Sequence, residues 1–144
     1  MNAYMNQYQQ NQIDTASREQ ILIMLYDGAI RFCRQAVEAM AAEDRLSQRE
    51  SVSRALAIIT EFSNTLDREI GGEMAENLDA LYHFMIRELT SANLQSDPEK
   101  ITVVIGLLSE LRETWMQAIE IARQEQKPKA HVANSDYTPL KASL

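Results

Sequence analysis

One long amphipathic stretch, residues 15–40, most constrains what this chain can fold into. Its apolar residues recur at alternating steps of four and three, a spacing that lines one face of an α-helix. The positions are Leu22, Tyr26, Ala29, Cys33, Ala36 and Met40. Ser17 and Gln20 form a capping box, which predicts a helix from about Arg18 to about Ala42. Such a helix is not stable alone in water, so the rest of the chain must cover its apolar face.

A second helical stretch is predicted at about residues 48–70. Ser47 and Glu50 form another capping box at its start. Its expected core stripe is Val52, Leu56, Ile59, Phe62, Leu66 and Ile70. Gly71 and Gly72 tolerate positive φ angles and therefore predict the end of this helix.

Two more helices are expected in the remainder of the chain. One covers about residues 73–94, with the apolar positions Met74, Leu78, Leu81, Tyr82, Met85, Leu89 and Ala92 directed inward. The other begins at Asp97-Pro98, an acidic cap followed by proline at the first helical position, and runs to about Gln126. Four helices of similar length with short connections predict an all-α fold, an antiparallel up-down four-helix bundle.

Composition divides the chain into three parts. Residues 1–16 are rich in Asn and Gln, and we expect an N-terminal strap that docks on the body, or a frayed terminus. Residues 17–126 form the expected bundle. Residues 127–144 lose the helical spacing and gain Pro, which predicts a flexible tail.

Charge excludes two classes of partner. The net charge is −7, whereas nucleic acids and anionic membranes bind to positive surfaces, so neither is an expected partner. No apolar run approaches the length that spans a membrane, and no secretory signal pattern opens the chain, so we expect no membrane insertion. The single cysteine, Cys33, lies on an apolar helix face, where a small buried hydrophobic residue is expected. A cytoplasmic location fits these features.

The residues that catalysis or metal binding requires are sparse. The two histidines, His83 and His131, form no Glu-x-x-His pair, and the chain has no Gly-rich phosphate loop and no Cys/His cluster. We therefore expect no catalytic residues, no cofactor, no metal site and no enzymatic activity. One alternative is a histidine phosphotransfer domain that uses His83. Such domains usually place a basic residue three positions after the histidine and a small residue four positions after it, where this chain has Ile86 and Arg87.

The predicted helices carry more apolar residues than a bundle core requires, which is about three positions in seven. The surplus positions are Ile58, Phe84, Val103, Leu107 and Ile121. Irregular core packing would explain them, and so would a groove that binds another amphipathic or unfolded segment. The helical spacing alone leaves both explanations open.

Several short motifs together resemble the flagellar secretion chaperone family FliS. The motifs are Thr15-Ala16-Ser17, Met24-Leu25-Tyr26-Asp27-Gly28-Ala29, Gly71-Gly72-Glu73, Asn77-Leu78, Leu81-Tyr82, Ala92-Asn93 and Leu111-Arg112 with Trp115. The resemblance runs in order from about Tyr8 to Ala118. The departures are Arg18, where many members have proline, and His83-Phe84, where Asp-Tyr is commoner.

The resemblance implies a cytoplasmic export chaperone built as an antiparallel four-helix bundle. Such a chaperone binds the disordered C-terminal segment of flagellin, prevents premature polymerisation, and delivers its cargo to the flagellar type III export gate without hydrolysing nucleotide. In the family the strap can occupy part of the cargo groove, which would give Tyr8 and Ile13 a role.

The resemblance and the surplus apolar residues together suggest a path for the cargo. The hypothesis places Ile58, Phe62, Phe84, Val103, Leu107 and Ile121 along this path. Asn77 and Asn93 would form hydrogen bonds with the cargo backbone. A structural dimerisation module is a further alternative, and a weak homodimer remains open.

Overall fold

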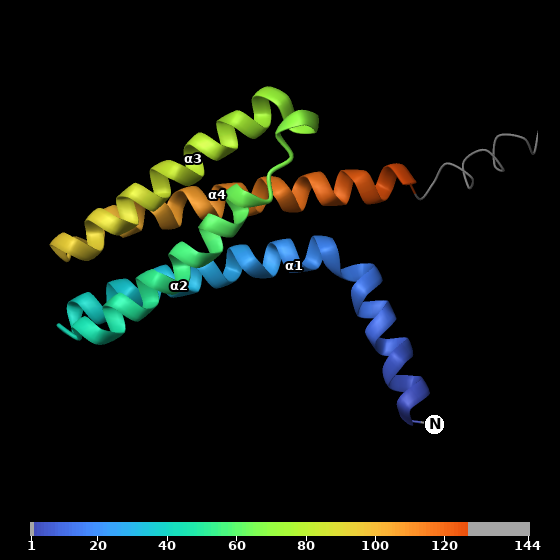
Figure 1. The fold of residues 1–144 in the computed structure, drawn as a ribbon, viewed down its shortest axis with the longest axis horizontal. Coiled ribbons are helices and arrows are strands. Elements are labelled where there is room, and N and C mark those ends of the chain that lie inside the picture. The colour runs from blue at the N-terminus through green and yellow to red at the C-terminus, as the bar shows by residue number, and fades with distance from the viewer. Residues whose placement is uncertain (1, 127–144) are drawn as a thin grey trace, which may run out of the picture. The chain divides into compact units, whose positions relative to one another are not determined.

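The computed structural model of the chain describes the backbone of residues 2–126 and the side chains of residues 18–126. This part contains four helices and no strand (Figure 1). The helices are α1 (Asn2–Ala41), α2 (Arg45–Asn64), α3 (Arg68–Gln95) and α4 (Pro98–Gln126). The predicted all-α four-helix bundle is confirmed. The tail predicted for residues 127–144 lies outside the described residues.

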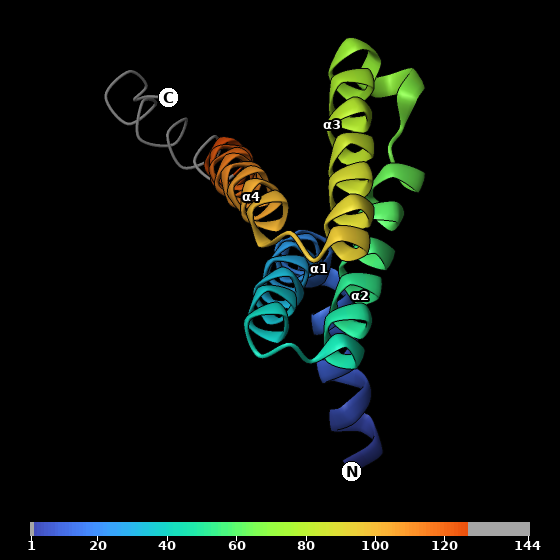
Figure 2. The same cartoon turned by 90° about the vertical axis from the view of Figure 1, so that its left-hand side faces the viewer.

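Two pairs of consecutive helices pack side by side within the first unit, Met1–Arg112. Helix α2 lies along α1, and α3 lies along α2 (Figures 1 and 2). The connections at residues 42–44 and 65–67 have three residues each, and such short connections make neighbouring helices run antiparallel. A second unit begins at Glu113, so α4 contributes residues to both units.

The core of the first unit is built around an aromatic cluster from three helices. The ring of Tyr26 on α1 stacks on Phe62 of α2, with ring centroids 4.4 Å apart. The Phe62 ring also lies 5.5 Å from the Tyr82 ring of α3. The hydroxyls of Tyr26 and Tyr82 share a buried hydrogen bond of 2.6 Å, so their polar ends are satisfied within the apolar cluster.

Cys33 is fully buried on the same face of α1 as Tyr26, as the sequence predicts. Burial raises the pKa of its thiol to about 12, because the charged thiolate is disfavoured away from water. The thiol is therefore protonated at neutral pH, and Cys33 serves as a packing residue.

Helix α1 begins earlier than the sequence pattern predicts. It starts at Asn2 rather than near Arg18, and Ser17 lies inside the helix instead of capping it. Residues 2–17 contain neither Gly nor Pro, so no strong breaker separates them from the amphipathic stretch. A strap role for residues 1–16 stays a prediction.

Helix α2 begins three residues earlier than predicted, because a different residue caps it. The carboxylate of Asp44 accepts hydrogen bonds from the backbone N–H of Ser47 at 3.1 Å and from its hydroxyl at 2.8 Å. Ser47 therefore serves as a donor to the cap and is not the cap itself. Aspartate at this position satisfies one of the free N–H groups of the first turn.

The boundary between α2 and α3 also differs from the prediction. Helix α2 ends at Asn64, and Asp67 caps α3 by accepting a hydrogen bond from Ile70 N–H at 3.0 Å. Gly72, with φ 56° and ψ −129°, makes a kink inside α3 and does not end α2. The side chains of Ile70 and Met74, both expected in the core, are 85% and 68% exposed.

Helix α4 follows the prediction closely. It begins at Pro98, and the carboxylate of Asp97 accepts a hydrogen bond from Glu99 N–H at 3.1 Å. In the first unit its core residues are Ile101, Val104 and Leu108, all fully buried. Over the described residues, none of the four helices combines the length and the apolar character that crossing a membrane requires.

Two glycines should respond in opposite directions to alanine substitution. Gly72→Ala should destabilise the chain by about 1–3 kcal/mol, because its positive φ is strained for any residue with a Cβ atom. Gly106→Ala should stabilise it by about 0.5–1 kcal/mol, because alanine is the better helix former. An added Cβ meets no atom within 4 Å at either position, so neither effect includes a clash. Urea denaturation followed by circular dichroism measures both, and equal effects would contradict the kink at Gly72.

Candidate partner-binding surface

Helix α4 exposes apolar side chains on a face separate from its core face. Val103 is 49% exposed, and Leu107, one turn further on, is half-buried. Neighbouring Ile101, Val104 and Leu108 are fully buried, so the first half of α4 has an inner and an outer apolar face. Both outer residues belong to the set that the sequence singles out.

Ile121, the third α4 residue of the predicted path, is 58% exposed. It belongs to the second unit. Its exposure leaves the side chain accessible for binding, and its role in cargo binding stays a prediction.

Two predicted path residues on α2 and α3 are partly exposed. Ile58 is half-buried, and its Cδ1 lies 3.4 Å from the position that a Cβ on Gly28 would occupy. The glycine in α1 therefore faces a side chain of α2 at ordinary contact distance. Phe84 on α3 is half-buried as well. Each of these two side chains is therefore partly buried and keeps part of its apolar surface exposed to solvent.

Phe62 differs from the other predicted path residues because it is a core residue. It is only 5% exposed and stacks on Tyr26. In this structure it supports the bundle and does not line its surface. Helical spacing cannot separate these two roles, because Phe62 lies on the core stripe of α2 in either case.

The two asparagines proposed to bind cargo backbone lie in different surroundings. Asn77 is exposed. Asn93 is half-buried, and both its backbone carbonyl and its side-chain oxygen accept hydrogen bonds from Gln48 Nε2, at 3.1 Å and 2.9 Å. Asn93 therefore joins the end of α3 to the start of α2, which the sequence did not reveal.

Tyr8 and Ile13 fall in the N-terminal part of α1, whose side chains are outside the described residues. Their predicted contacts with the groove are therefore not tested by the structure.

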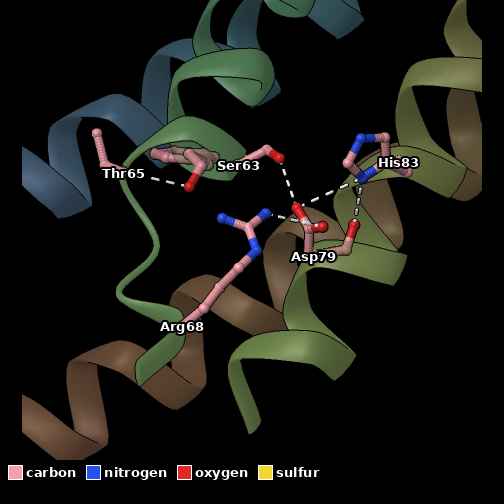
Figure 3. Close-up of polar contacts among 6 residues, drawn as sticks. Ser63, Thr65, Arg68, Asp79 and His83 are labelled. Carbon is pink, nitrogen blue, oxygen red and sulfur yellow. Dashed lines mark hydrogen bonds and ion pairs between the residues drawn. The ribbon is translucent and has the colours of Figure 1, made fainter. Parts of the chain in front are cut away.

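A polar cluster that the sequence pattern does not predict lies at the junction of α2 and α3 (Figure 3). The carboxylate of Asp79 accepts a 2.5 Å hydrogen bond from the hydroxyl of Ser63 and pairs with the Arg68 guanidinium at 2.9 Å. The Nδ1 atom of His83 lies 2.9 Å from the Asp79 carbonyl oxygen and 3.4 Å from its carboxylate. Asp79 thus links the end of α2 to both sides of the kink in α3.

The stability of this cluster should depend on acid. The hydrogen bond from Ser63 and the pairing with Arg68 lower the pKa of Asp79. A lowered pKa in the folded state stabilises the fold above the pKa of a free aspartate, about 3.9, and this stabilisation is lost as pH falls through the lower folded value. Asp79→Asn should therefore be less stable than the wild type at pH 7, with the difference shrinking below about pH 3.9. Urea denaturation at several pH values tests this, and a pH-independent difference would contradict it.

Residues of the FliS-like motifs pair with one another across the bundle. Besides the Tyr26–Tyr82 hydrogen bond, Arg112 Nε donates to the Asp27 carboxylate at 2.5 Å. Asn93, another motif residue, accepts a hydrogen bond from Gln48, which lies outside the motifs. These motif residues therefore stabilise the packing of the helices on one another.

The motif residues lie within a longer segment that matches a known protein family. The family described as "Flagellar protein FliS" matches residues 1–122 of the chain. The chain belongs to the FliS family. A flagellar secretion chaperone FliS of Bacillus subtilis is 33% identical over 126 residues, which cover 88% of this chain and 93% of that protein.

Other FliS proteins give the same result. The flagellar secretion chaperone FliS of Campylobacter jejuni is 40% identical, with 78% of this chain and 88% of that protein covered. The one from Salmonella typhimurium is 39% identical, with 80% and 86% covered. Membership places the chain among the flagellar secretion chaperones.

FliS proteins are named chaperones and form a non-enzymatic family, which confirms that the chain is not an enzyme. The alternative role for His83, as a phosphotransfer residue, therefore has no support from the relatives. Its ring instead contacts Asp79 within the α2–α3 cluster. Among the described residues, no group of three or more His, Cys, Asp or Glu side chains could hold a metal ion.

Proposed function

We propose that the chain is a cytoplasmic export chaperone for flagellin. It binds the disordered C-terminal segment of flagellin, prevents premature polymerisation, and delivers the protein to the flagellar type III export gate. The observation that carries this proposal is the outer apolar face of α4, where Val103 and Leu107 keep exposed surface next to a complete core face. The names of the FliS relatives, all flagellar secretion chaperones, support the same role.

The chemistry of this face suits an unfolded cargo. A segment that folds on binding can extend over several helices and bury apolar side chains at each of them. Ordering the segment offsets part of the interaction free energy, so the complex can release its cargo at the export gate. A chaperone that acts before export requires this balance.

The proposed path runs over the partly exposed residues of three helices. Ile58 of α2, Phe84 of α3, and Val103 and Leu107 of α4 provide its apolar contacts in the first unit. Exposed Asn77 supplies hydrogen bonds to cargo backbone. Phe62 supports the path indirectly, because its stacking on Tyr26 holds α2 on α1. Ile121 and Asn93 are further proposed contacts.

Residues 1–16 are proposed to act as a strap that occupies part of this path before cargo arrives. Tyr8 and Ile13 would then fill apolar sites that flagellin side chains take over. Removing residues 1–16 should strengthen flagellin binding by a few-fold, because cargo no longer has to displace the strap.

Size-exclusion chromatography with light scattering tests the proposed function. Mixed with monomeric flagellin, the chain should form a 1:1 complex and should stop seeded filament growth at equimolar ratio. Flagellin without its C-terminal segment should neither bind nor be inhibited. Failure to bind intact flagellin would overturn the proposal, and the same runs on the chain alone determine whether it forms a homodimer.

A further inference from the structure

A polar depression lies where the last turns of α1 meet the first turns of α2. Its volume is about 420 Å³, and it is open to solvent. None of its residues belongs to the predicted cargo path. The residues that matter for its chemistry are Glu38, Ala39, Asp44, Glu50, Ser51 and Arg54.

The charges around this depression are predominantly negative. Three carboxylates, those of Glu38, Asp44 and Glu50, stand against the single guanidinium of Arg54. That guanidinium carbon lies 5.7 Å from the centroid of the Phe32 ring, within range of a cation–π contact. Arg54 is therefore held partly by an aromatic face and leaves the carboxylates in excess.

The three carboxylates differ in whether a neighbouring side chain already binds them. Hydrogen bonds from the backbone N–H and hydroxyl of Ser47 lower the pKa of Asp44, so it stays ionised at neutral pH. Within residues 18–126, the structure gives neither Glu38 nor Glu50 an ion pair or a hydrogen bond from a side chain. Their negative charge is not neutralised by a neighbour.

Ser51 provides an observation that is independent of charge. It lines the depression, is only 8% exposed, and has no side-chain hydrogen bond among the described residues. Several hydroxyls elsewhere in the helices have partners, such as Thr90, which donates to the Ile86 carbonyl at 2.8 Å, and Ser63, which donates to Asp79. Buried polar groups are nearly always hydrogen-bonded, so an unpaired buried hydroxyl beside free carboxylates points to a ligand that donates hydrogen bonds.

We propose that this depression binds a primary ammonium or guanidinium group. Such a cation carries several N–H donors and no acceptor, which matches a site made of carboxylate and hydroxyl oxygens. Buried Ala39 offers an apolar wall for the alkyl stem that bears the cation. A lysine or arginine side chain from a basic protein segment presents this chemistry, and so does a free polyamine.

Titration of the full chain, followed by the NMR shifts of its backbone amides, tests the proposal. The probes are pentalysine and spermidine, which separate a peptide source of the cation from a polyamine source. The amides of Ser47, Glu50 and Ser51 should shift in a saturable way with at least one probe. The probe that binds more tightly at these amides identifies the source.

Paired charge variants separate this site from general attraction to an acidic protein. Glu38→Gln with Glu50→Gln should weaken binding about tenfold or more, and Ser51→Ala should weaken it about threefold. The control, Glu73→Gln with Glu76→Gln, changes two exposed α3 residues by the same charge and should weaken binding less than about twofold. No saturable shift with either probe, or equal weakening by the two pairs, would overturn the proposal.

Discussion

Val103→Glu and Leu107→Glu should each weaken binding of the flagellin C-terminal segment by about 100-fold or more. Either substitution places a carboxylate where the proposed path requires apolar contact, and burying that charge without a partner is strongly unfavourable. Val103 is 49% exposed and Leu107 is half-buried on the same outer face, so a carboxylate at either position can reach water and should leave the fold intact in the absence of cargo. Helical circular dichroism at 222 nm should therefore match that of the wild type, and fluorescence anisotropy of a labelled segment measures the affinity.

The matched control is Leu94→Glu. Leu94 is 81% exposed near the end of α3 and is not a path residue, so this variant makes the same chemical change outside the outer apolar face of α4. It should bind the segment within about twofold of the wild type. If all three variants bind equally well, the proposed path over α4 is wrong. If all three lose binding, the effect is general electrostatic repulsion.

Phe62→Ala should destabilise the chain by about 3–5 kcal/mol, the usual range for removing a buried aromatic ring. The residue is 5% exposed, stacks on Tyr26 and lies 5.5 Å from the Tyr82 ring, so its loss leaves a cavity among three helices. Urea denaturation gives the free energy of unfolding. Because such a loss is a large part of a typical domain's stability, Phe62→Leu provides a milder variant that should still fold.

Phe84→Ala serves as the comparison for Phe62. Phe84 is half-buried, so the same truncation should cost about half as much free energy of unfolding or less. Flagellin binding should show the reverse ranking, since Phe84 is proposed to touch cargo directly. Equal stability losses at the two positions would contradict the assignment of Phe62 to the core and Phe84 to the surface.

Local signals in the sequence sufficed for the fold class and for part of the element boundaries. Asp97-Pro98 predicts the start of α4 correctly, because acidic cap and proline act within a single turn. The prediction that Gly71-Gly72 ends α2 is wrong. Glycine permits a positive φ, but a positive φ can occur either at a helix end or at a kink inside a helix. Ile70 fits the stripe of α2 by spacing, yet α2 ends at Asn64 and the side chain is 85% exposed.

The candidate site was predictable only in part, because the same apolar residue types occur in the core and on a binding surface. Val103 and Leu107 were found as apolar residues off the core face, and their exposure agrees with that. The helical spacing places Phe62 on the path although its side chain is buried, because spacing does not show which residues cover an apolar stripe. The hydrogen bonds Gln48–Asn93 and Ser63–Asp79 join residues that are distant in sequence, and no local sequence pattern predicts such pairs.

Isothermal titration calorimetry with the C-terminal segment of flagellin tests the central claim most directly. The account predicts saturable 1:1 binding with a negative heat-capacity change, measured at two or more temperatures, because apolar surface is buried as the segment orders. The N-terminal segment of flagellin should give no saturable heat under the same conditions. Absence of binding by the C-terminal segment, or equal binding by both segments, would contradict the account.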